Sequence, residues 1–553
     1  MTIVQRRIGG IFGLFFLLLL LASARTLYLG TLKGGSLRKA AATQQLTAEA
    51  VPAQRGSISD RNGIDLAVSE PAQDISATPY LVKDPLATAQ RLAPLLGKQQ
   101  AQVLRLLSER SGFVYLKRAL PAKQASAVMA LKIPGLAGVP VMRRVYPRGD
   151  LAAQVLGVVG TEGNGLSGLE YSRNALLHGH TGERHVVSDA VGEPVSITEP
   201  HHESPGTSIS LTLDANIQQR TEDVLGAVGR VFNPKDATAI VMDPNSGAIL
   251  AMANWPQVNA NDPGGSSPEA LQNRAVSFDY EPGSTFKAVT VAGALQQGLV
   301  TPSSSFFIPD KIQVADRTIH DDTEHGDESL TTAQILAQSS NVGAIKIGML
   351  EGKSKFGKWL SRFGFGARTG IELPGEEIGQ VPPVSHYSGS SMGNLPIGQG
   401  QLVTPLQMAS AYAAIANGGI LRPPHIIRSV GSDVRADPPG QRVISSATSA
   451  ALRQMLEGVL APGGTASEVS IPGYRLAGKT GTASKVDAAT GEYSKTRYVA
   501  SFMGFAPASD PKLLSAVIVD EPQTGSIFGG TVAAPAFGQI MSFALPYLRI
   551  APG

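Results

Sequence analysis

The chain of 553 residues has no cysteine, only two tryptophans and few charged side chains. The absence of cysteine excludes disulfides, thiolate catalysis, iron–sulfur clusters and cysteine-based zinc sites. Charged residues make up 16% of the chain, whereas typical soluble domains contain roughly 25%. Hydrophobic residues make up 42%, which is enough for buried cores and excludes a wholly disordered polymer. A chain of this length predicts more than one domain.

An excess of charge of either sign is also missing. Lysine and arginine total 47 and aspartate and glutamate total 44, so the net charge is 47 − 44 = +3. A nucleic-acid-binding protein needs clustered basic residues, and a nearly neutral chain gives no such indication. We therefore expect no nucleic-acid partner.

One long apolar run stands near the N-terminus. Residues 8–24 contain no charge, Arg6 and Arg7 precede them and Arg25 follows. Such a run predicts a single membrane-spanning helix, and the basic residues before it predict a cytoplasmic N-terminus and an exported body. A cleaved signal peptide is the alternative, because Ala22-Ser23-Ala24 has the small-x-small form of a cleavage site.

The rest of the chain divides at a polar stretch with two prolines and a glycine, residues 199–206. We predict a cytoplasmic stub and anchor over 1–30, a stalk over 31–50, and two large domains over 51–204 and 205–553. Helical periodicity occurs over 85–110 and 119–132. The second large domain begins with a predicted strand hairpin, 237–242 and 248–253, continues with predicted helices at 286–297, 331–349 and 404–417, and ends with predicted strands at 474–484, 498–505 and 513–520. This order predicts one antiparallel sheet flanked by helices.

A serine and a lysine share one face of a predicted helix. Ser284 and Lys287 lie three residues apart after a Pro-Gly turn. A serine hydroxyl attacks a carbonyl only when a base takes its proton, and a lysine can be that base if burial lowers its pKa. The pattern is weak by itself, because S-x-x-K also occurs at Ser36/Lys39 and Ser509/Lys512.

Two further short motifs follow in order. Ser339 and Asn341 lie in a predicted helix, where a hydroxyl can relay protons and an amide can both donate and accept. On a predicted strand, Lys479 offers a positive charge and Gly481 allows a substrate backbone to approach.

Hydroxyls complete the third motif. Thr480 and Thr482 flank Gly481 and can bind a substrate carboxylate. The backbone N–H groups of Thr482 and Ser284 could form an oxyanion hole.

The ordered set S-x-x-K, S-x-N, K-T-G is the signature of penicillin-recognising serine enzymes, and the chain resembles the class B penicillin-binding proteins. Other stretches share the resemblance: Asn273-Arg274-Ala275, Tyr280-Glu281-Pro282-Gly283, Val403-Thr404-Pro405-Leu406-Gln407 and, in the first large domain, Arg55-Gly56-x-Ile58-x-Asp60-Arg61-x-Gly63, Arg144-x-Tyr146-Pro147 and Gly165-x-x-Gly168-x-Glu170. In that family the last three motifs are structural.

The resemblance implies an α+β multidomain fold with one N-terminal transmembrane helix, a mixed pedestal (dimerisation-type) domain and a serine transpeptidase domain. It implies a peptidoglycan D,D-transpeptidase in which Ser284 attacks the bond between two terminal D-alanines and neutral Lys287 takes its proton. Ser339 and Asn341 would relay protons and orient the peptide. Lys479, Thr480 and Thr482 would hold the terminal carboxylate, beside Gly481. An acceptor amine would resolve the acyl-enzyme, with no cofactor and no metal.

The same resemblance implies the setting of the reaction. The enzyme would lie in the bacterial inner membrane with an extracytoplasmic catalytic domain. Its partners would be D-Ala-D-Ala stem peptides, β-lactams, a lipid-II polymerase and other divisome proteins. The segment from Tyr280 to Lys287 is most like the division (septal) type.

Several alternatives stay open. The chain could be an elongation-type or sporulation-type transpeptidase. A D,D-carboxypeptidase or β-lactamase would need no pedestal, and between Asn341 and Lys479 there is no Glu-x-x-Leu-Asn segment to supply a hydrolytic base. A penicillin sensor would have several membrane spans and a cytoplasmic effector domain.

One cluster of possible metal ligands occurs between predicted elements, formed by His320, Asp321, Asp322, Glu324, His325 and Asp327. Nothing in the pattern fixes a ligand geometry, so we interpret this segment as a solvated acidic loop.

Overall fold

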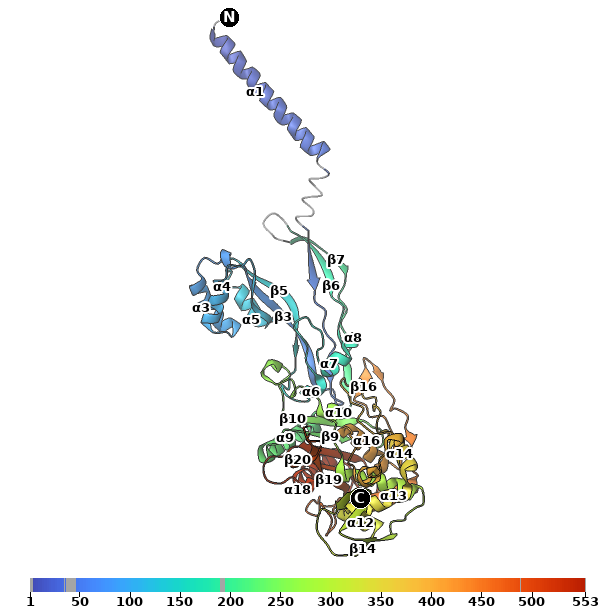
Figure 1. The fold of residues 1–553 in the computed structure, drawn as a ribbon. Coiled ribbons are helices and arrows are strands. Elements are labelled where there is room, and N and C mark those ends of the chain that lie inside the picture. Colours follow the sequence, from blue (N-terminus) through green and yellow to red (C-terminus); the bar gives the residue numbers. More distant parts are fainter. Residues whose placement is uncertain (1–2, 34, 36–45, 189–193, 488, 553) are drawn as a thin grey trace. The chain divides into compact units, whose positions relative to one another are not determined.

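The computed structural model describes residues 3–33, 35, 46–188, 194–487 and 489–552 (Figure 1). The chain forms two compact units. The first consists of Met1–Gln54, Pro71–Met142 and Gly179–Gly206, and the second of Arg55–Glu70, Arg143–His178 and Thr207–Gly553. The second unit thus contains two stretches of the predicted 51–204 domain, which include the pedestal motifs. The domain boundaries stay a prediction.

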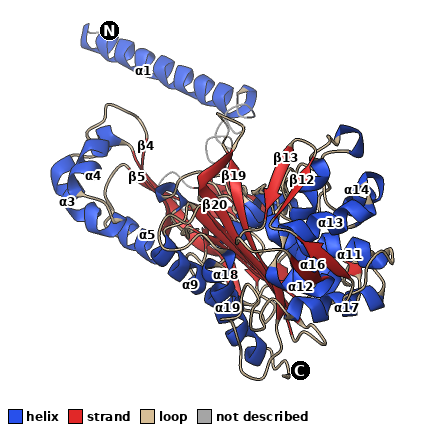
Figure 2. Cartoon of the chain, turned by 60° about the horizontal axis from the view of Figure 1, so that its bottom comes forward, coloured by secondary structure: helices blue, strands red, loops and turns tan. Residues whose placement is uncertain are grey.

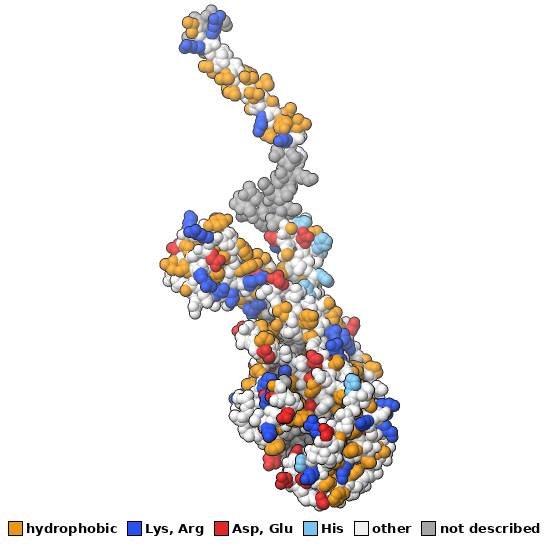
Figure 3. All heavy atoms as spheres, in the orientation of Figure 1, with side chains coloured by type: hydrophobic (Ala, Val, Ile, Leu, Met, Phe, Trp, Pro, Cys, Tyr) orange, Lys and Arg blue, Asp and Glu red, His pale blue; other side chains and the backbone are white. Residues whose placement is uncertain are grey.

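The first unit begins with a long apolar helix. Helix α1 spans Ile3–Leu27 and continues as the π-helix η1, Tyr28–Leu32. The segment Arg6–Leu32 is long and apolar enough to cross a membrane. Figure 3 shows hydrophobic side chains along this helix and basic side chains near both of its ends. The predicted apolar helix is therefore present and extends beyond residue 24.

The rest of the first unit combines a small sheet with a helical subdomain. The sheet has the antiparallel order β1-β6-β7, with β1 at Leu46–Val51, β6 at Gly182–Ser188 and β7 at Pro194–His201. The subdomain contains α3 (Pro85–Leu96), α4 (Gln100–Leu107), β4 (Val114–Pro121), α5 (Ala122–Met129) and the part of β5 (Leu136–Val145) up to Met142. Its buried core includes Leu92, Val103 and Leu116.

Local sequence explains the ends of these helices. The Asp84 carboxylate accepts a hydrogen bond from the Ala87 N–H and caps α3, and Gly97, with φ of 61°, ends it. The predicted helix over 85–110 is therefore two helices. The prediction over 119–132 is wrong for its first residues, because residues 119–121 complete strand β4.

The second unit is built on a five-stranded antiparallel sheet of order β10-β9-β21-β20-β19. Its strands are β9 (Asp236–Met242), β10 (Ile249–Trp255), β19 (Ala477–Val486), β20 (Tyr493–Ala506) and β21 (Leu513–Asp520). The predicted sheet is confirmed, including the hairpin of its first two strands. Strand β19, which carries the K-T-G motif, lies at an edge.

Helices cover both faces of this sheet (Figure 2). On one face, α9 (Ala215–Phe232) and α19 (Ala534–Tyr547) share a buried core with alternate sheet residues. The other face packs on a larger core that includes α16 (Pro405–Ala416) and α17 (Ser446–Glu457). That core also takes in helices α11 (Lys287–Gln296), α12 (Thr332–Gln338), α13 (Asn341–Glu351) and α14 (Lys353–Arg362).

Smaller elements complete the second unit. The first residues of β3 (Asp65–Ala77) join a sheet with β2 (Ile58–Ser59), β8 (Ile209–Leu211), β16 (Ile427–Val430) and β17 (Asp433–Val434). Short strands pair as β11 (Ser305–Ile308) with β14 (Glu328–Thr331), β12 (Lys311–Val314) with β13 (Arg317–His320), and β15 (Ile420–Leu421) with β18 (Gln441–Arg442). Short helices are α6 (Ala153–Leu156), α7 (Gly168–Ser172), α8 (Asn174–Leu177), α10 (Arg274–Ser277), α15 (Ser391–Asn394) and α18 (Gly529–Val532).

A buried ion cluster joins the pedestal motifs within the second unit. The Glu170 carboxylate accepts hydrogen bonds from Nε of Arg55 and from Nε of Arg144, each at 2.6 Å. A second Arg55 nitrogen, Nη2, donates to the Glu170 carbonyl oxygen at 2.8 Å. Asp60 accepts from the Ala215 N–H at 3.0 Å and so contacts the start of α9. These motif residues therefore fasten segments 55–70 and 143–178 to the larger sheet domain.

Candidate active site

Ser284 lies in a tight turn that leads directly into a helix. The turn is the 3-10 helix η4, Gly283–Phe286, and α11 follows it. Gly283 has φ of 54°, a conformation that favours glycine, and its N–H donates to the Gly398 carbonyl at 3.1 Å. The Ser284 side chain is half-buried, and its hydroxyl makes no hydrogen bond with any residue that the structure describes. This hydroxyl is free to approach a ligand.

Lys287 is fully buried at the first turn of α11. Its Nζ atom donates to three oxygens: the Ser339 carbonyl at 2.5 Å, the Ser339 hydroxyl at 3.2 Å and Oδ1 of Asn341 at 2.7 Å. Burial lowers the pKa of Lys287 to about 8, even though the charges of Asp322 and Asp321 raise it. Lys287 is therefore neutral in a substantial fraction of molecules near neutral pH and can accept a proton.

The second motif lies between two helices, so the predicted continuous helix over 331–349 is wrong at this point. Ser339 has φ of 66° and ends α12 in a left-handed conformation. The Ser340 hydroxyl then caps α13 by accepting from the Gly343 N–H at 2.9 Å. This break turns the Ser339 side chain and the Asn341 amide toward Lys287.

Lys479 is the second fully buried lysine. Its Nζ donates to the carbonyl oxygen of Thr480 at 3.2 Å and to its hydroxyl at 3.3 Å. Burial lowers the pKa of Lys479 well below its usual value, and the nearby charge of Lys287 lowers it further. The hydroxyls of Thr480 and Thr465 lie 2.6 Å apart. No motif connects Thr465 to the K-T-G strand, so the sequence alone does not predict this contact.

The Ser284 turn packs directly against the K-T-G strand. A Cβ atom added at Gly481 would lie 2.9 Å from Cγ2 of Thr285, and one added at Gly283 would lie 3.1 Å from Cβ of Ala483. The Thr482 hydroxyl accepts a hydrogen bond from the Gly529 N–H at 3.1 Å. Glycine at 481 therefore allows the close approach that brings the first and third motifs together.

Strand β19 contributes more than its side chains. It pairs with β20 on one side and lies at the edge of the sheet. The other side of an edge strand presents unpaired N–H and C=O groups, which can bind an extended peptide. The half-buried hydroxyl, a buried amine of lowered pKa and an open strand edge together suit attack on a peptide carbonyl.

The other two S-x-x-K matches do not form such a site. Ser509 and Lys512 lie on the exposed turn between β20 and β21, where Nζ of Lys512 contacts the Asp510 carboxylate at 2.8 Å. Ser36 and Lys39 lie outside the described residues.

The acidic loop differs from its interpretation as a solvated segment. The Asp321 side chain is only 8% exposed, and its carboxylate accepts hydrogen bonds from the N–H groups of Asn341 and Val342 and from the Ser340 hydroxyl. Asp321 therefore caps helix α13, whereas Asp322 and Glu324 are exposed. Across the described parts of the chain, no three His, Asp or Glu side chains gather as metal ligands.

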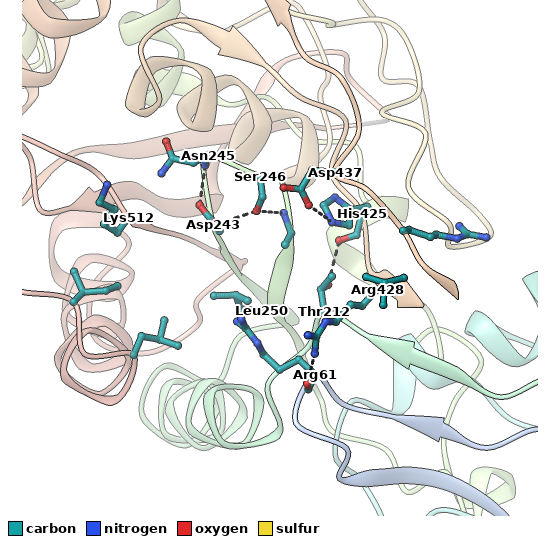
Figure 4. A pocket seen from close by; sticks show the side chains of 15 residues that line it. Arg61, Thr212, Asp243, Asn245, Ser246, Leu250, His425, Arg428, Asp437 and Lys512 are labelled. Carbon is teal, nitrogen blue, oxygen red and sulfur yellow. Dashed lines mark hydrogen bonds and ion pairs between the residues drawn. The ribbon is translucent and has the colours of Figure 1, made fainter. Parts of the chain in front are cut away.

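A separate cavity of about 540 Å³ lies elsewhere in the second unit, and it is lined by none of the candidate site residues Ser284, Lys287, Ser339, Asn341 and Lys479 to Thr482 (Figure 4). Its polar side chains largely pair with one another. Asp243 accepts from the Asn245 N–H at 2.8 Å and from the Ser246 hydroxyl at 2.9 Å, and His425 faces Asp437 at 3.7 Å. These contacts stabilise the turn between β9 and β10 and its surroundings.

Comparisons with known proteins agree with the motifs. The penicillin binding protein transpeptidase domain family matches residues 237–542, and the penicillin-binding protein dimerisation domain family matches residues 50–211. The penicillin-binding protein PbpB of Mycolicibacterium smegmatis is 34% identical, over 95% of this chain and 88% of its own length. The peptidoglycan D,D-transpeptidase FtsI of Escherichia coli is 33% identical, over 98% of this chain and 91% of its own length.

A solved structure gives the same result. The crystal structure of penicillin-binding protein 3 from Mycobacterium tuberculosis, complexed with aztreonam, superposes with a TM-score of 0.72 at 31% identity. The similarity covers 91% of this chain and 98% of that chain.

Proposed function

Because the chain belongs to the class B penicillin-binding proteins, we propose that Ser284 is the residue acylated by the donor stem peptide and by β-lactams. The protein is a peptidoglycan D,D-transpeptidase. The observation that carries the assignment is the buried Lys287 amine, which lies three residues after Ser284 and contacts Ser339 and Asn341.

The proposed reaction follows from these positions. Neutral Lys287 takes the proton of Ser284 as its oxygen attacks the carbonyl between the two terminal D-alanines. Ser339 relays the proton toward the departing D-alanine, and Asn341 holds Lys287. An acceptor amine then attacks the acyl-enzyme, forms the cross-link and frees Ser284.

The third motif has the complementary role. Lys479 and the hydroxyls of Thr480 and Thr482 bind the terminal carboxylate of the donor peptide, and the edge of β19 aligns its backbone. The N–H groups of Ser284 and Thr482 stabilise the oxyanion.

The experiment that tests this assignment is labelling of the full-length protein with a fluorescent penicillin. We expect Ser284→Ala to abolish labelling while the melting temperature is unchanged. Ser509→Ala is the matched control, because Ser509 belongs to the same motif pattern but lies on an exposed turn. An adduct mapped by mass spectrometry to any serine other than Ser284 would refute the assignment.

We also propose that the protein acts in septal wall synthesis, anchored by α1 in the inner membrane with its catalytic domain outside the cytoplasm. The support is the segment from Tyr280 to Lys287, which is most like the division type, and the length and apolar character of α1. A lipid-II polymerase and other divisome proteins are the proposed partners. Depletion in the native cell distinguishes the roles, since filaments indicate division, rounded cells indicate elongation, and a sporulation defect indicates the third type.

A further inference from the structure

The last residue of β13, His320, and the first two residues of the loop that leads to β14, Asp321 and Asp322, contact the second motif. Oδ1 of Asp321 accepts from the first two N–H groups of α13, including the Val342 N–H at 3.0 Å. Its Oδ2 accepts from the Ser340 hydroxyl at 2.8 Å and contacts Nε2 of His325 at 3.1 Å. The nearly buried Asp321 carboxylate thus fixes the backbone that places Asn341.

The same loop fixes the orientation of the Asn341 amide. Nδ2 of Asn341 donates to the His320 carbonyl at 2.9 Å and to Oδ1 of Asp322 at 3.1 Å. Both N–H donors of the amide are therefore occupied by the loop. The amide oxygen is left to face Nζ of Lys287, at 2.7 Å. A flipped amide would instead direct N–H groups at the lysine.

We propose that Asp321 and Asp322 are positioning residues for acylation. Asp321 holds the start of helix α13, and Asp322, with the His320 carbonyl, fixes the Asn341 amide so that its oxygen holds Lys287. This inference rests on the proposed roles of Ser284 and Lys287.

The charges of the loop add a separable effect. The charges of Asp322 and Asp321 from the loop act on Lys287, and the charge of Lys287 acts in turn on Lys479 from β19. The two carboxylates raise the pKa of Lys287, and Asp322 also raises that of Lys479. Removing the Asp322 charge therefore makes Lys287 neutral at lower pH. A purely structural loop would not change the pH dependence of acylation.

The experiment measures the second-order acylation rate of the full-length protein by a penicillin between pH 6 and 10. Asp322→Asn keeps an acceptor for the Asn341 amide and removes the charge. We therefore expect the acidic limb of the pH–rate profile, where the rate rises with pH, to move to lower pH by about half a pH unit. At pH 7 this variant then reacts about threefold faster than the unchanged protein, because half a pH unit is a factor of about three in the neutral fraction.

Asp322→Ala removes both the charge and the acceptor. We expect the same shift of the acidic limb. The acylation rate on the high-pH plateau should also be about tenfold lower, which corresponds to the loss of one charge-assisted hydrogen bond that orients a reacting group.

Asp321→Asn should lower this plateau rate further, and its thermal unfolding is measured in parallel because the variant removes part of a helix cap. Glu324→Gln is the matched control: it lies in the same loop, is exposed and makes no side-chain hydrogen bond within the described residues.

Two results would separate this inference from the assignment of Ser284. In the first result, the unchanged protein is acylated on Ser284, but both Asp322 variants have the same acidic limb and the same plateau rate in the pH–rate profile as Glu324→Gln. The positioning role is then refuted and the proposed function stands. If the unchanged protein is not acylated on Ser284, the proposed function itself fails.

Discussion

The buried Glu170 carboxylate and the two buried lysines of the candidate site, all in the second unit, differ in how their charge is compensated. Glu170 is fully buried, and the guanidinium groups of Arg55 and Arg144 contact its carboxylate, each at 2.6 Å. Lys287 and Lys479 are equally buried, but their Nζ atoms contact only carbonyl, hydroxyl and amide oxygens. Burial lowers the pKa of both lysines, because neutral oxygens replace only part of the water that a charged amine loses.

This difference in compensation distinguishes buried charges that stabilise the fold from buried groups that can react. A buried ion pair with good geometry keeps its charge and holds segments together, and removing one partner leaves the other without compensation. A buried amine without a contacting carboxylate loses its proton easily and becomes a base. Four predictions would break or sharpen this distinction.

The largest effect is expected for Lys287→Met. This variant removes the proposed base but keeps most of the volume, so we expect acylation by penicillin to fall by about 10²–10⁴, the usual contribution of a general base. The free energy of unfolding at pH 7 should stay the same or rise by about 1–2 kcal/mol, because a buried charge that lacks an ion partner is replaced by an apolar group. Acylation kinetics and chemical denaturation measure the two quantities. A destabilised but reactive variant would contradict the comparison.

Glu170→Gln should give the opposite result. Two buried guanidinium groups would lose their shared carboxylate, and we expect the free energy of unfolding to fall by about 3–5 kcal/mol. The fraction that remains folded should acylate at nearly the original rate. Denaturation monitored by circular dichroism tests the first part, with the exposed Glu468→Gln as control. A loss of reactivity without a loss of stability would show that this cluster is not merely structural.

The pH dependence of acylation should follow the Lys287 amine. Its pKa is lowered from 10.5 to about 8, and the amine acts as a base only when neutral. The acylation rate should therefore rise about tenfold per pH unit up to pH 8 and level off above it. Stability should also rise between pH 8 and 10.5, since in that range the unfolded state binds the proton that the folded state has lost. A rate that is constant between pH 6 and 8 would exclude Lys287 as the base.

The smallest effect is expected for Thr465→Val. This substitution removes the hydroxyl that lies 2.6 Å from the Thr480 hydroxyl, and both groups are neutral. A neutral hydrogen bond contributes about 1 kcal/mol, so acylation should slow by roughly fivefold. Rate constants for Thr465→Val and Thr465→Ser, which keeps the hydroxyl, provide the comparison. Equal rates for both variants would show that this hydroxyl pair does not position Thr480.

The sequence predicted much of the second unit because its strands and helices have strong local signals. Strand β21 is rich in apolar residues and is buried at every position, and the start of α16 is marked by a Thr-x-x-Gln capping box. The motif residues that the structure brings together by hydrogen bonds, Lys287, Ser339 and Asn341, were all found by their residue types and order.

The features that the sequence did not predict depend on tertiary contacts, which local residue patterns do not encode. Nothing in the sequence around Asp321 distinguishes it from the exposed Asp322, because its role depends on a helix cap twenty residues away. The left-handed conformation of Ser339 was missed because serine has no preference for it. The partnership of Thr465 with Thr480 depends on tertiary packing.

The conformation of Ser339 has an evolutionary consequence. A left-handed serine costs about 1–2 kcal/mol, a cost that glycine would remove. Glycine at this position would also remove the hydroxyl that Nζ of Lys287 contacts. With the proton-relay role proposed for Ser339, selection for a stable fold and selection for a reactive enzyme oppose each other at residue 339.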